Sequence, residues 1–360
     1  MLSPKAKWNL SRILPFGVIW LASALIFLVV EKGAVGMVGA NPEWQIEMTL
    51  SVFVFSSLAA FSVGLIFGSI EIFYLNRVFS SKSFLKKILY KLLIYVVVMY
   101  VVVFITYPIA ASLDLGTSLF DKQVLEKFYS YLTSINHLST DVQLAVTQGL
   151  CLLYTEISEN IGNRVFFNLF RGKYHQPKEE ERVFMFLDMK SSTTIAERLG
   201  HITYFELLKT YYADISDAVI NNGGEVYQYV GDEMVVSWRV KRQVNYNHCI
   251  NCFFAMKEAL AGQKVKYEER FGVLPSFKAG LHLGKVTTGE IGVVKREIIF
   301  TGDVLNTTAR IQSLCNEFEV DLLVSGELVS RLDLKDIRVN ELGEKVLKGK
   351  KEPVVLYSLG

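Results

Sequence analysis

Three long runs without a charged residue dominate the N-terminal part of this chain of 360 residues. They cover residues 13–30, 48–70 and 92–113. At about 1.5 Å of helix per residue, each run is long enough to cross a hydrocarbon core about 30 Å thick. We therefore expect an N-terminal all-α domain of transmembrane helices in a lipid bilayer. A cleaved signal peptide is the alternative for the first run, but two more spans follow it and no small-residue cleavage pattern does.

Charged residues beside the runs predict their orientation. Residues 1–12 contain Lys5, Lys7 and Arg12 and no acid, whereas residues 31–47 contain three acids and one lysine. Residues 77–91 contain five basic side chains and no acid. Because Lys and Arg concentrate in cytoplasmic loops, we expect the N-terminus and the second loop to be cytoplasmic in a multi-pass protein of the inner cell membrane.

A fourth span is needed if the C-terminal half is also cytoplasmic. The candidate is residues 142–160, which begin with the uncharged stretch VQLAVTQGLCLLYT but include Glu156 and Glu159. A soluble helix beside the membrane is the alternative. With four spans, the chain divides into a membrane domain at 1–162, a juxtamembrane linker at 163–180 and a second domain at 181–360.

Composition argues against two other kinds of site. The formal net charge is +2, the basic residues lie mostly next to the membrane, and no basic helix interleaved with aromatic residues follows, so we expect no nucleic-acid partner. Cys249 and Cys252 form a CxxC pair, but a zinc site needs a second pair or suitably spaced histidines. We expect both thiols to be buried on one helix.

Strand and helix patterns alternate in residues 181–360. The stretches GGEVYQYV and EMVVSWRV predict a hairpin with Gly231 and Asp232 at its tip. RVFMFLDM, FKAGLHLGKVTTGEI, REIIFTG, VDLLVS and a final pair ending in VVLYSL predict the other strands. Helices are predicted at 193–221, 245–270 and 303–316. Strands with helices crossing one face make an α+β sandwich.

Two aspartates lie at the ends of predicted strands. Asp188 ends the first strand and Asp232 lies at the hairpin tip. In such a sandwich these strands are neighbours, so both carboxylates can reach one point. Together with the helix start at Ser191, Ser192 and Thr193, they would suit Mg²⁺ and a phosphate. The alternative is that each aspartate is a turn or cap residue, which is the commoner use of a single Asp.

A third element adds an amide and two cations. Asn306 and Arg310 in GDVLNTTAR are four residues apart on a predicted helix, so they share a face. A neutral hydrogen-bonding group and a fixed cation suit a ribose and a phosphate that develops charge. Lys348, expected at the start of a strand in LKGKKEPVVLYSL, offers a second cation.

Four ordered motifs together carry a resemblance to a known family. FLDMKSST, YQYVGDE, GDVLNTTAR and LKGKKEPVVLYSL resemble the catalytic domain of class III adenylate and guanylate cyclases, here of a membrane-anchored bacterial type. The resemblance covers nearly all of residues 181–360. It implies a ferredoxin-like, palm-type sheet and a phosphorus–oxygen lyase that makes a cyclic nucleotide for intracellular signalling.

The resemblance also implies a role for each motif residue. Asp188, Asp232 and the backbone of Met189 would hold two Mg²⁺ or Mn²⁺ ions. Asn306 would orient the ribose, Arg310 would stabilise the pentavalent α-phosphate, and Lys348 would bind the polyphosphate. The ribose 3′-hydroxyl would attack the α-phosphate in line and release pyrophosphate. In this family the metal aspartates and the Asn and Arg pair come from opposite subunits, which implies a homodimer with composite active sites and an inactive monomer.

Base recognition departs from the family pattern. Gln228 stands where adenylate cyclases usually carry lysine and guanylate cyclases glutamate, and Ile299 stands where an adenylate cyclase would carry Asp or Thr. A glutamine amide can pair with adenine or, after a flip, with guanine. We favour ATP because nothing acidic stands where guanine's donors would need it, with a guanylate cyclase that uses GTP as the alternative.

Two further functions compete with a cyclase. A diguanylate cyclase has a related hairpin, but this one lacks the second glycine and that family has no NTTAR helix. A catalytically dead receptor or binding module is the other alternative, to which the departures at Gln228 and Ile299 lend weight. We expect Glu233 to be a hairpin residue that faces solvent or a neighbouring cation, without a metal role.

Overall fold

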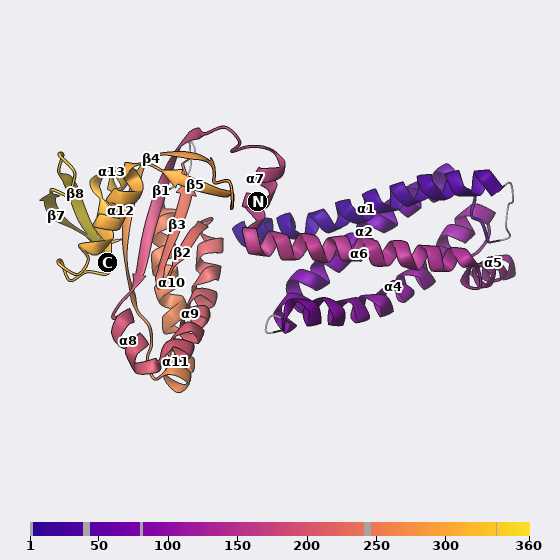
Figure 1. Ribbon diagram of the computed structural model, residues 1–360, viewed down its shortest axis with the longest axis horizontal. Helices are drawn as coiled ribbons and strands as arrows, with labels where there is room; N and C mark the ends of the chain where they lie inside the picture. Colours follow the sequence, from indigo (N-terminus) through magenta and orange to yellow (C-terminus); the bar gives the residue numbers. More distant parts are fainter. Residues whose placement is uncertain (1–2, 39–43, 80–81, 241–245, 336) are drawn as a thin grey trace. The chain divides into compact units, whose positions relative to one another are not determined.

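The computed structural model describes residues 3–38, 44–79, 82–240, 246–335 and 337–360 (Figure 1). They form two compact units, of which one is Lys7–Phe167 and the other contains Asn168–Gly360. Each unit is described below by itself.

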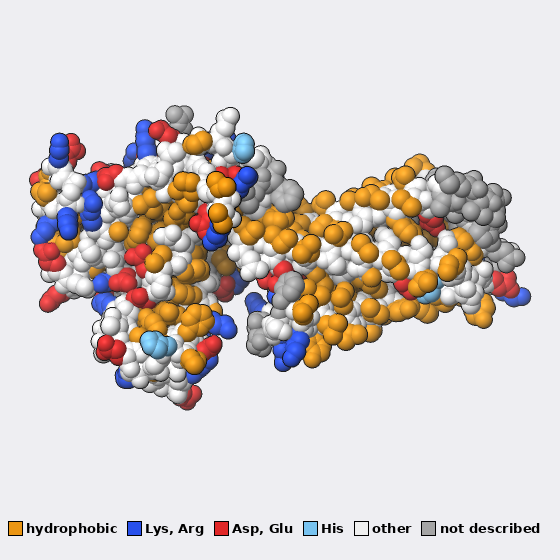
Figure 2. Space-filling view, in the orientation of Figure 1, with side chains coloured by type: hydrophobic (Ala, Val, Ile, Leu, Met, Phe, Trp, Pro, Cys, Tyr) orange, Lys and Arg blue, Asp and Glu red, His pale blue; other side chains and the backbone are white. Residues whose placement is uncertain are grey.

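Long helices make up the first unit. Three of them, at Pro4–Glu31, Leu50–Val78 and Leu85–Leu115, are long and apolar enough to cross a membrane. These stretches belong to α1 (Pro4–Val38), to α2 (Leu50–Ile70) with its continuation η1 (Glu71–Leu75) and α3 (Asn76–Val78), and to α4 (Phe84–Leu115). Hydrophobic side chains cover much of the visible surface of this unit (Figure 2). The three spans predicted at 13–30, 48–70 and 92–113 are confirmed as membrane-crossing candidates.

The predicted fourth span lies within one long helix. After α5 (Lys122–Leu132), α6 (Ile135–Ile161) contains residues 142–160 but is not among the three apolar candidates found in the described part of the chain. Its side chains Leu144, Cys151, Leu152 and Tyr154 are buried in one cluster with Phe16, Phe67 and Tyr95 from α1, α2 and α4. α6 is therefore a full member of this helical bundle.

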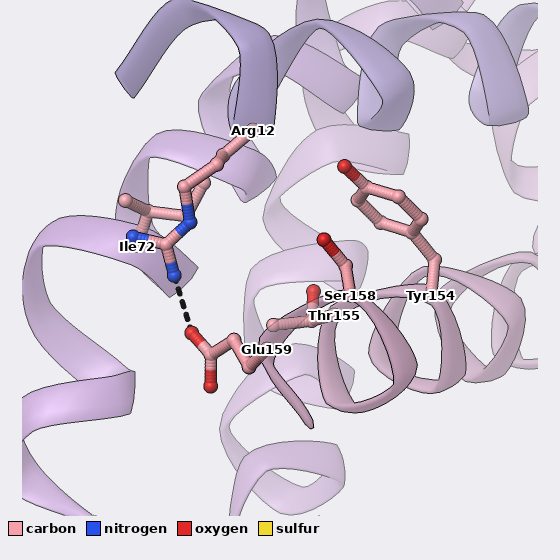
Figure 3. A pocket seen from close by; sticks show the side chains of 6 residues that line it. All are labelled: Arg12, Ile72, Tyr154, Thr155, Ser158 and Glu159. Atoms are coloured by element: carbon pink, nitrogen blue, oxygen red, sulfur yellow. Dashed lines mark hydrogen bonds and ion pairs between the residues drawn. The ribbon is translucent and has the colours of Figure 1, made fainter. Parts of the chain in front are cut away.

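Paired charges lie inside the bundle. Glu71 and Lys91 form a fully buried ion pair, Tyr95 donates its hydroxyl to Glu71 Oε2 at 2.6 Å, and Lys91 donates to Asn76 Oδ1 at 2.7 Å. Glu71 begins a π-helical turn, a local widening that is often found at functional sites. A small cavity is lined by Arg12, Ile72, Tyr154, Thr155, Ser158 and Glu159, with Arg12 paired to Glu159 (Figure 3).

A short helix and a mixed sheet follow. After α7 (Asn163–Phe170), the strands lie in the order β2-β3-β1-β4-β6-β8-β7, and β5 pairs with β4 beside this path. Their bounds are β1 (Lys178–Met189), β2 (Glu225–Val230), β3 (Glu233–Arg239), β4 (Phe277–Ile291), β5 (Glu297–Thr301), β6 (Leu322–Ser325), β7 (Val339–Lys345) and β8 (Val354–Leu359). All recorded pairs are antiparallel except β4 with β6. The α+β fold class is confirmed.

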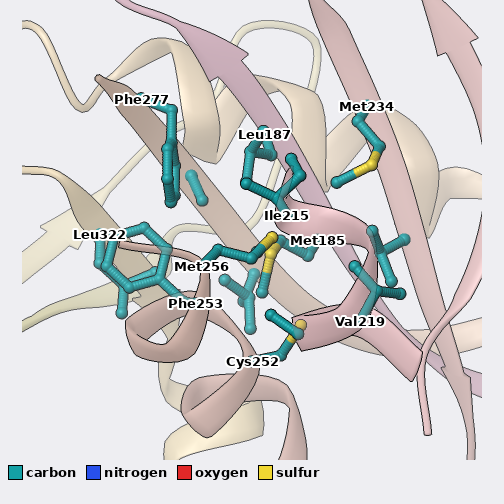
Figure 4. Packing of buried hydrophobic residues seen from close by; sticks show 14 of the residues in the cluster. Met185, Leu187, Ile215, Val219, Met234, Cys252, Phe253, Met256, Phe277 and Leu322 are labelled. Atoms are coloured by element: carbon teal, nitrogen blue, oxygen red, sulfur yellow. The ribbon is translucent and has the colours of Figure 1, made fainter. Parts of the chain in front are cut away.

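Helices cover both faces of this sheet, so the expectation of a single covered face is wrong. On one face, α9 (His201–Asn221) and α10 (Asn247–Ala261) bury Ile215, Phe253 and Met256 against Met185 and Leu187 of β1 (Figure 4). On the other face, α12 (Asp303–Ser313) packs Val304 against Phe184 and Phe186 of β1 and Val286 of β4. Successive side chains of a strand point to opposite faces of the sheet. Because helices cover both faces, consecutive residues of β1 are buried and apolar.

Several predicted boundaries differ from the structure. The helix predicted at 193–221 is two helices, α8 (Ser192–Leu199) and α9, because Gly200 between them has φ +74°, which helical backbone does not allow. The helix predicted at 245–270 is α10 followed by α11 (Lys264–Phe271), and Asn245 lies outside the described residues. The chain also contains α13 (Gly326–Val329), α12 ends three residues earlier than predicted, and β1 begins within the predicted linker.

Candidate active site

Asp188 and Asp232 converge at one end of the sheet. Asp188 lies near the end of β1 and pairs in register with Glu233, the first residue of β3, which directly follows Asp232 in the turn. Burial raises the pKa of the Asp188 carboxyl, and the nearby negative charge of Asp232 raises it further. The negative charge of Asp232 is therefore close enough to act on the Asp188 carboxyl, an arrangement that suits two ligands of a shared cation.

Two side chains that the sequence did not reveal contact Asp188. Lys278 Nζ lies 3.3 Å from Asp188 Oδ2, and the Gln312 amide donates to the same oxygen at 3.2 Å. Lys278 lies directly opposite Asp188 in the β1–β4 register, and Gln312 reaches it from α12. Both contacts depend on which strands pair and which helix covers them. The sequence signal is a lysine in a strand that pairs with β1.

The hairpin that carries Asp232 is fixed from α9. Gly231 adopts φ +63°, a conformation that favours glycine, and this turns the chain just before Asp232. The hydroxyl of Tyr212 donates to the carbonyl of Gly231 at 2.9 Å and lies 3.3 Å from that of Glu233. The helix thereby holds both backbone neighbours of the aspartate.

Glu233 is half-buried rather than turned to solvent. Its pKa is raised by burial and by the negative charges of Asp188 and Asp232, so it departs from the expectation of a residue that faces solvent. Glu233 thus adds negative potential beside the two aspartates.

The donor set at this point fits a hard divalent cation. Asp188 and Asp232 supply carboxylate oxygens, and the side chain of Met189 is buried in the core, which leaves only its backbone for a ligand. Oxygen donors are those that Mg²⁺ and Mn²⁺ prefer. A cation between the aspartates would also relieve the repulsion that raises the pKa of Asp188.

A short turn separates the end of β1 from the start of α8. Ser191 has a positive φ of 53° and lies outside the helix, Ser192 is the first helical residue, and Thr193 is exposed. None of the first residues of the helix is capped by the side chain of Ser191. Amide groups in the first turn of a helix lack helical partners and favour phosphate oxygens.

Asn306 and Arg310 lie on α12, and Lys348 lies in the loop between β7 and β8. Asn306 is exposed and Arg310 half-buried. The loop after β7 packs closely against this arginine, since a Cβ on Gly349 would lie 3.5 Å from Arg310 Nη2. Lys348 is exposed in that loop, so the expectation that it begins a strand is wrong, and it directly precedes Gly349. Next to it, Lys350 Nζ lies 3.0 Å from Asp303 Oδ2.

Within one chain, the aspartate pair and the pair of Asn306 and Arg310 lie on different sides of α12. Gln312 faces the sheet and contacts Asp188. Arg310 is two residues earlier, which on an α-helix is a rotation of about 200°. Asn306 and Arg310 therefore project away from the aspartates of their own chain.

The two base-recognition positions lie on different strands. Gln228 is exposed on β2, where the register shifts by one residue between Val226 and Gln228. Ile299 is half-buried on β5, opposite Gly289 of β4. Their neighbours Tyr227 and Phe300 are in contact, with ring centres 4.8 Å apart.

The CxxC pair and a buried histidine are structural. Cys249 and Cys252 are buried on α10. Burial raises the pKa of both thiols, that of Cys249 to about 12, so neither thiol is disposed to ionise. His282 is buried on β4, where its Nδ1 lies 2.8 Å from Ser325 Oγ.

Comparison with known proteins agrees with this geometry. Residues 174–360 match the family model described as the adenylate and guanylate cyclase catalytic domain. Adenylate cyclase 2 of Rhizobium meliloti (strain 1021) is 36% identical over 229 residues, which are 63% of this chain and 62% of that protein. Adenylate cyclase 1 of the same organism is 26% identical over 186 residues, or 50% of this chain and 27% of that protein. The chain thus spans less than two thirds of either relative.

A solved structure shares the fold. A bacterial light-regulated adenylyl cyclase superposes with a TM-score of 0.54 at 19% identity, over 64% of this chain and 67% of its own. At that level of identity, the similarity supports only the fold. Because the family model covers more than half of the chain and includes every motif residue described above, this protein belongs to the class III adenylate and guanylate cyclase family.

Proposed function

We propose that this chain is a membrane-bound adenylate cyclase that converts ATP to 3′,5′-cyclic AMP and pyrophosphate. The observation that carries the proposal is the division of polar groups around α12. Asp188 and Asp232 converge on one side, and Asn306 and Arg310 project from the other. The first set suits cations and a triphosphate, and the second suits a ribose and a reacting phosphate.

Each residue then has a separate task. Asp188, Asp232 and the backbone of Met189 would hold the cations. Bound Mg²⁺ or Mn²⁺ would favour ionisation of the ribose 3′-hydroxyl and neutralise the leaving pyrophosphate. Asn306 orients the ribose, and Arg310 donates to the α-phosphate oxygens as they gain charge. Lys348 binds the polyphosphate, and the amides around Ser191, Ser192 and Thr193 offer it further donors.

A complete site requires two copies of the chain. Because Arg310 faces away from Asp188 of its own chain, we place the cations of one protomer against Asn306 and Arg310 of the partner subunit. A head-to-tail homodimer then has two equivalent sites, and a monomer is inactive.

The membrane arrangement follows from the helical bundle. We assign α6 as the fourth span, because its apolar face packs among α1, α2 and α4. The acids Glu156 and Glu159 near its end pair with Lys87 and Arg12, both from segments rich in basic residues. These pairs favour a cytoplasmic position for this end of the bundle, and hence for the domain that follows, at the inner cell membrane.

ATP is the proposed substrate. The relatives reported above are named adenylate cyclases, and Gln228 can present a donor and an acceptor to adenine. GTP is the alternative, because the same amide, once flipped, matches guanine and Ile299 can only pack.

Product analysis of the purified full-length protein tests the proposal. Cyclic AMP formed from ATP with Mg²⁺ or Mn²⁺ is expected, and Asp232→Ala should abolish it. Asp333→Ala is the matched control, because that carboxylate is exposed and lies 3.7 Å from Lys335. Cyclic GMP formed from GTP in preference would overturn the substrate. No cyclic product from a folded dimer would instead support a catalytically dead binding module.

A further inference from the structure

Arg182 is a fully buried cation near the start of β1, on the face of the strand that also carries Asp188 near its end. It is 1% exposed. Its guanidinium donates from Nη1 to Glu180 Oε2 at 3.1 Å and from Nη2 to Glu225 Oε2 at 2.7 Å and to Ser237 Oγ at 2.9 Å. One side chain therefore ties β1 to both β3 and β2. Such a buried pair adds little net stability compared with an apolar cluster, so its geometry invites another explanation.

The same guanidinium also packs against an aromatic ring of β5. Its Cζ is 4.6 Å from the ring centre of Phe300, the residue directly after Ile299. The face of an aromatic ring attracts a cation, and desolvation strengthens the attraction. Arg182 thus contacts the two strands that carry Gln228 and Ile299, through Glu225 on β2 and Phe300 on β5.

Tyr227 completes this bridge. It is the extra residue at the register shift in β2, directly before Gln228. Its hydroxyl accepts the backbone N–H of Phe300 at 3.2 Å, and the two rings are in contact. β5 pairs with β4, and β3 and β1 separate β4 from β2 in the sheet. The bond from Phe300 to Tyr227 therefore joins two strands, β5 and β2, that do not pair. Bulges are often used in this way to re-aim side chains next to active sites.

We propose that Arg182 and Tyr227 are positioning residues for base recognition. They set the separation of Gln228 from Ile299, and so determine how well the amide of Gln228 meets the edge of the purine. Neither residue needs to contact the nucleotide. The inference rests on the proposed function, which gives Gln228 and Ile299 the base. Hydrogen bonds weaken steeply with distance and angle, so a small shift of either strand would change the preference between ATP and GTP.

Three variants of the full-length protein test this role. Tyr227→Phe removes the hydroxyl that accepts from Phe300 but keeps the ring. Arg182→Lys keeps the charge but loses the fork that joins Glu180, Glu225 and Ser237. Tyr267→Phe is the matched control, because its hydroxyl donates to Asp214 at 2.8 Å on the opposite face of the sheet. For each, KM and kcat are measured with ATP and with GTP, beside thermal unfolding.

Tyr227→Phe and Arg182→Lys are expected to raise KM for the preferred nucleotide and to lower the ratio of kcat/KM between the nucleotides by about three- to ten-fold, with kcat much less affected. Tyr267→Phe should leave that ratio unchanged even where it lowers the unfolding temperature. If the cluster were purely structural, Tyr227→Phe and Arg182→Lys would lower the unfolding temperature and leave the ratio of the folded enzyme unchanged. That result overturns the inference.

The outcome can be separated from a failure of the proposed function. If the wild-type protein forms no cyclic product, the same variants are compared by equilibrium binding of ATP and GTP. A nucleotide preference that Tyr227→Phe and Arg182→Lys weaken, and Tyr267→Phe does not, supports the positioning role without turnover. An unchanged preference, or no binding of either nucleotide by the folded wild type, contradicts it.

Discussion

At the scale of single residues, the environment of His282 favours the neutral imidazole. The side chain is 4% exposed, and burial, together with the positive charge of Lys350, lowers its pKa from 6.5 to about 4. Glu327 approaches Nδ1 at 3.1 Å but is largely exposed, so solvent screens its charge. Such a histidine resists protonation in the folded protein and accepts it in the unfolded chain.

Stability should therefore fall as the pH falls through this window. A group whose pKa is lowered on folding contributes stability above its unfolded pKa and loses it toward the folded one. Between pH 7 and pH 5, His282 alone should lower the free energy of unfolding by about 2 kcal/mol. Urea unfolding of the fragment 168–360 at both pH values measures this. His282→Gln should reduce the pH dependence, and an equal dependence in that variant would contradict the assignment.

The Glu71 and Lys91 pair predicts an asymmetric mutational effect. Both side chains are fully buried, and Tyr95 also donates to Glu71. Lys91→Met would leave a buried carboxylate without its cation, which costs about 3–5 kcal/mol. Thermal unfolding in detergent should show a large loss for Lys91→Met and a smaller one for the double variant with Glu71→Gln. A double variant less stable than the single one would contradict this account.

At the scale of elements, the close packing of α12 on β4 positions Asn306 and Arg310. Gly280 makes this approach possible, because a Cβ there would lie 2.4 Å from the backbone nitrogen of Gln312. Any side chain at this position must push the helix away from the sheet.

Gly280→Ala is therefore expected to lower both stability and turnover. Overpacking of this kind costs about 1–3 kcal/mol. A helix displaced by a few tenths of an ångström or more also misplaces Arg310, so kcat should fall by about ten- to a hundred-fold. Gly262→Ala is the control, because the nearest atom to its Cβ would be 3.5 Å away at an ordinary φ of −64°. Steady-state kinetics of both variants checks the prediction, and full activity in Gly280→Ala would contradict it.

Local patterns made much of this architecture predictable. The uncharged runs predicted the three apolar spans, and the turn at Gly231 between two alternating stretches predicted the hairpin, because both signals depend on neighbouring residues. The break at Gly200 was missed, since an isolated glycine is tolerated inside many helical patterns. Its positive φ became evident only in the structure.

Contacts between distant segments could not be predicted in the same way. Lys278 and Gln312 meet Asp188 only because β4 pairs with β1 and α12 covers the sheet. Helices on both faces of the sheet, and the bridge from Tyr227 to Phe300, likewise depend on topology. The order of two strands predicts that the motif residues Asp188 and Asp232 lie together, and the effect of the Asp232 charge on the pKa of the Asp188 carboxyl supports that placement.

At the scale of the whole molecule, the catalytic unit begins before the predicted domain boundary. Tyr174 is buried, its carbonyl accepts the backbone N–H of Glu290 at 3.1 Å, and its hydroxyl approaches Glu180 at 3.4 Å. A fragment that began at 181 would lose Tyr174 and the first residues of β1. Residues 168–360 are therefore the appropriate fragment for the experiments below.

That fragment should depend on concentration in a way that the full-length protein does not. If two chains form each site, the fragment must associate before it reacts, whereas chains held in one membrane meet at a high effective concentration. The specific activity of the fragment should rise with its concentration and that of the membrane-embedded protein should stay constant. A fragment with constant specific activity down to concentrations at which it is monomeric would contradict the need for a dimer.

Complementation between two inactive chains tests the composite site most directly. Asp232→Ala and Arg310→Ala should each be inactive alone, since each destroys both sites of its own dimer. Co-expressed in equal amounts, they should recover about a quarter of the wild-type activity, because about half of the dimers are mixed and each mixed dimer has one intact site. Two chains that carry the same change serve as the control. Recovery confined to the mixture is the predicted result, and a mixture as inactive as its components, with mixed dimers demonstrated, would contradict the composite site.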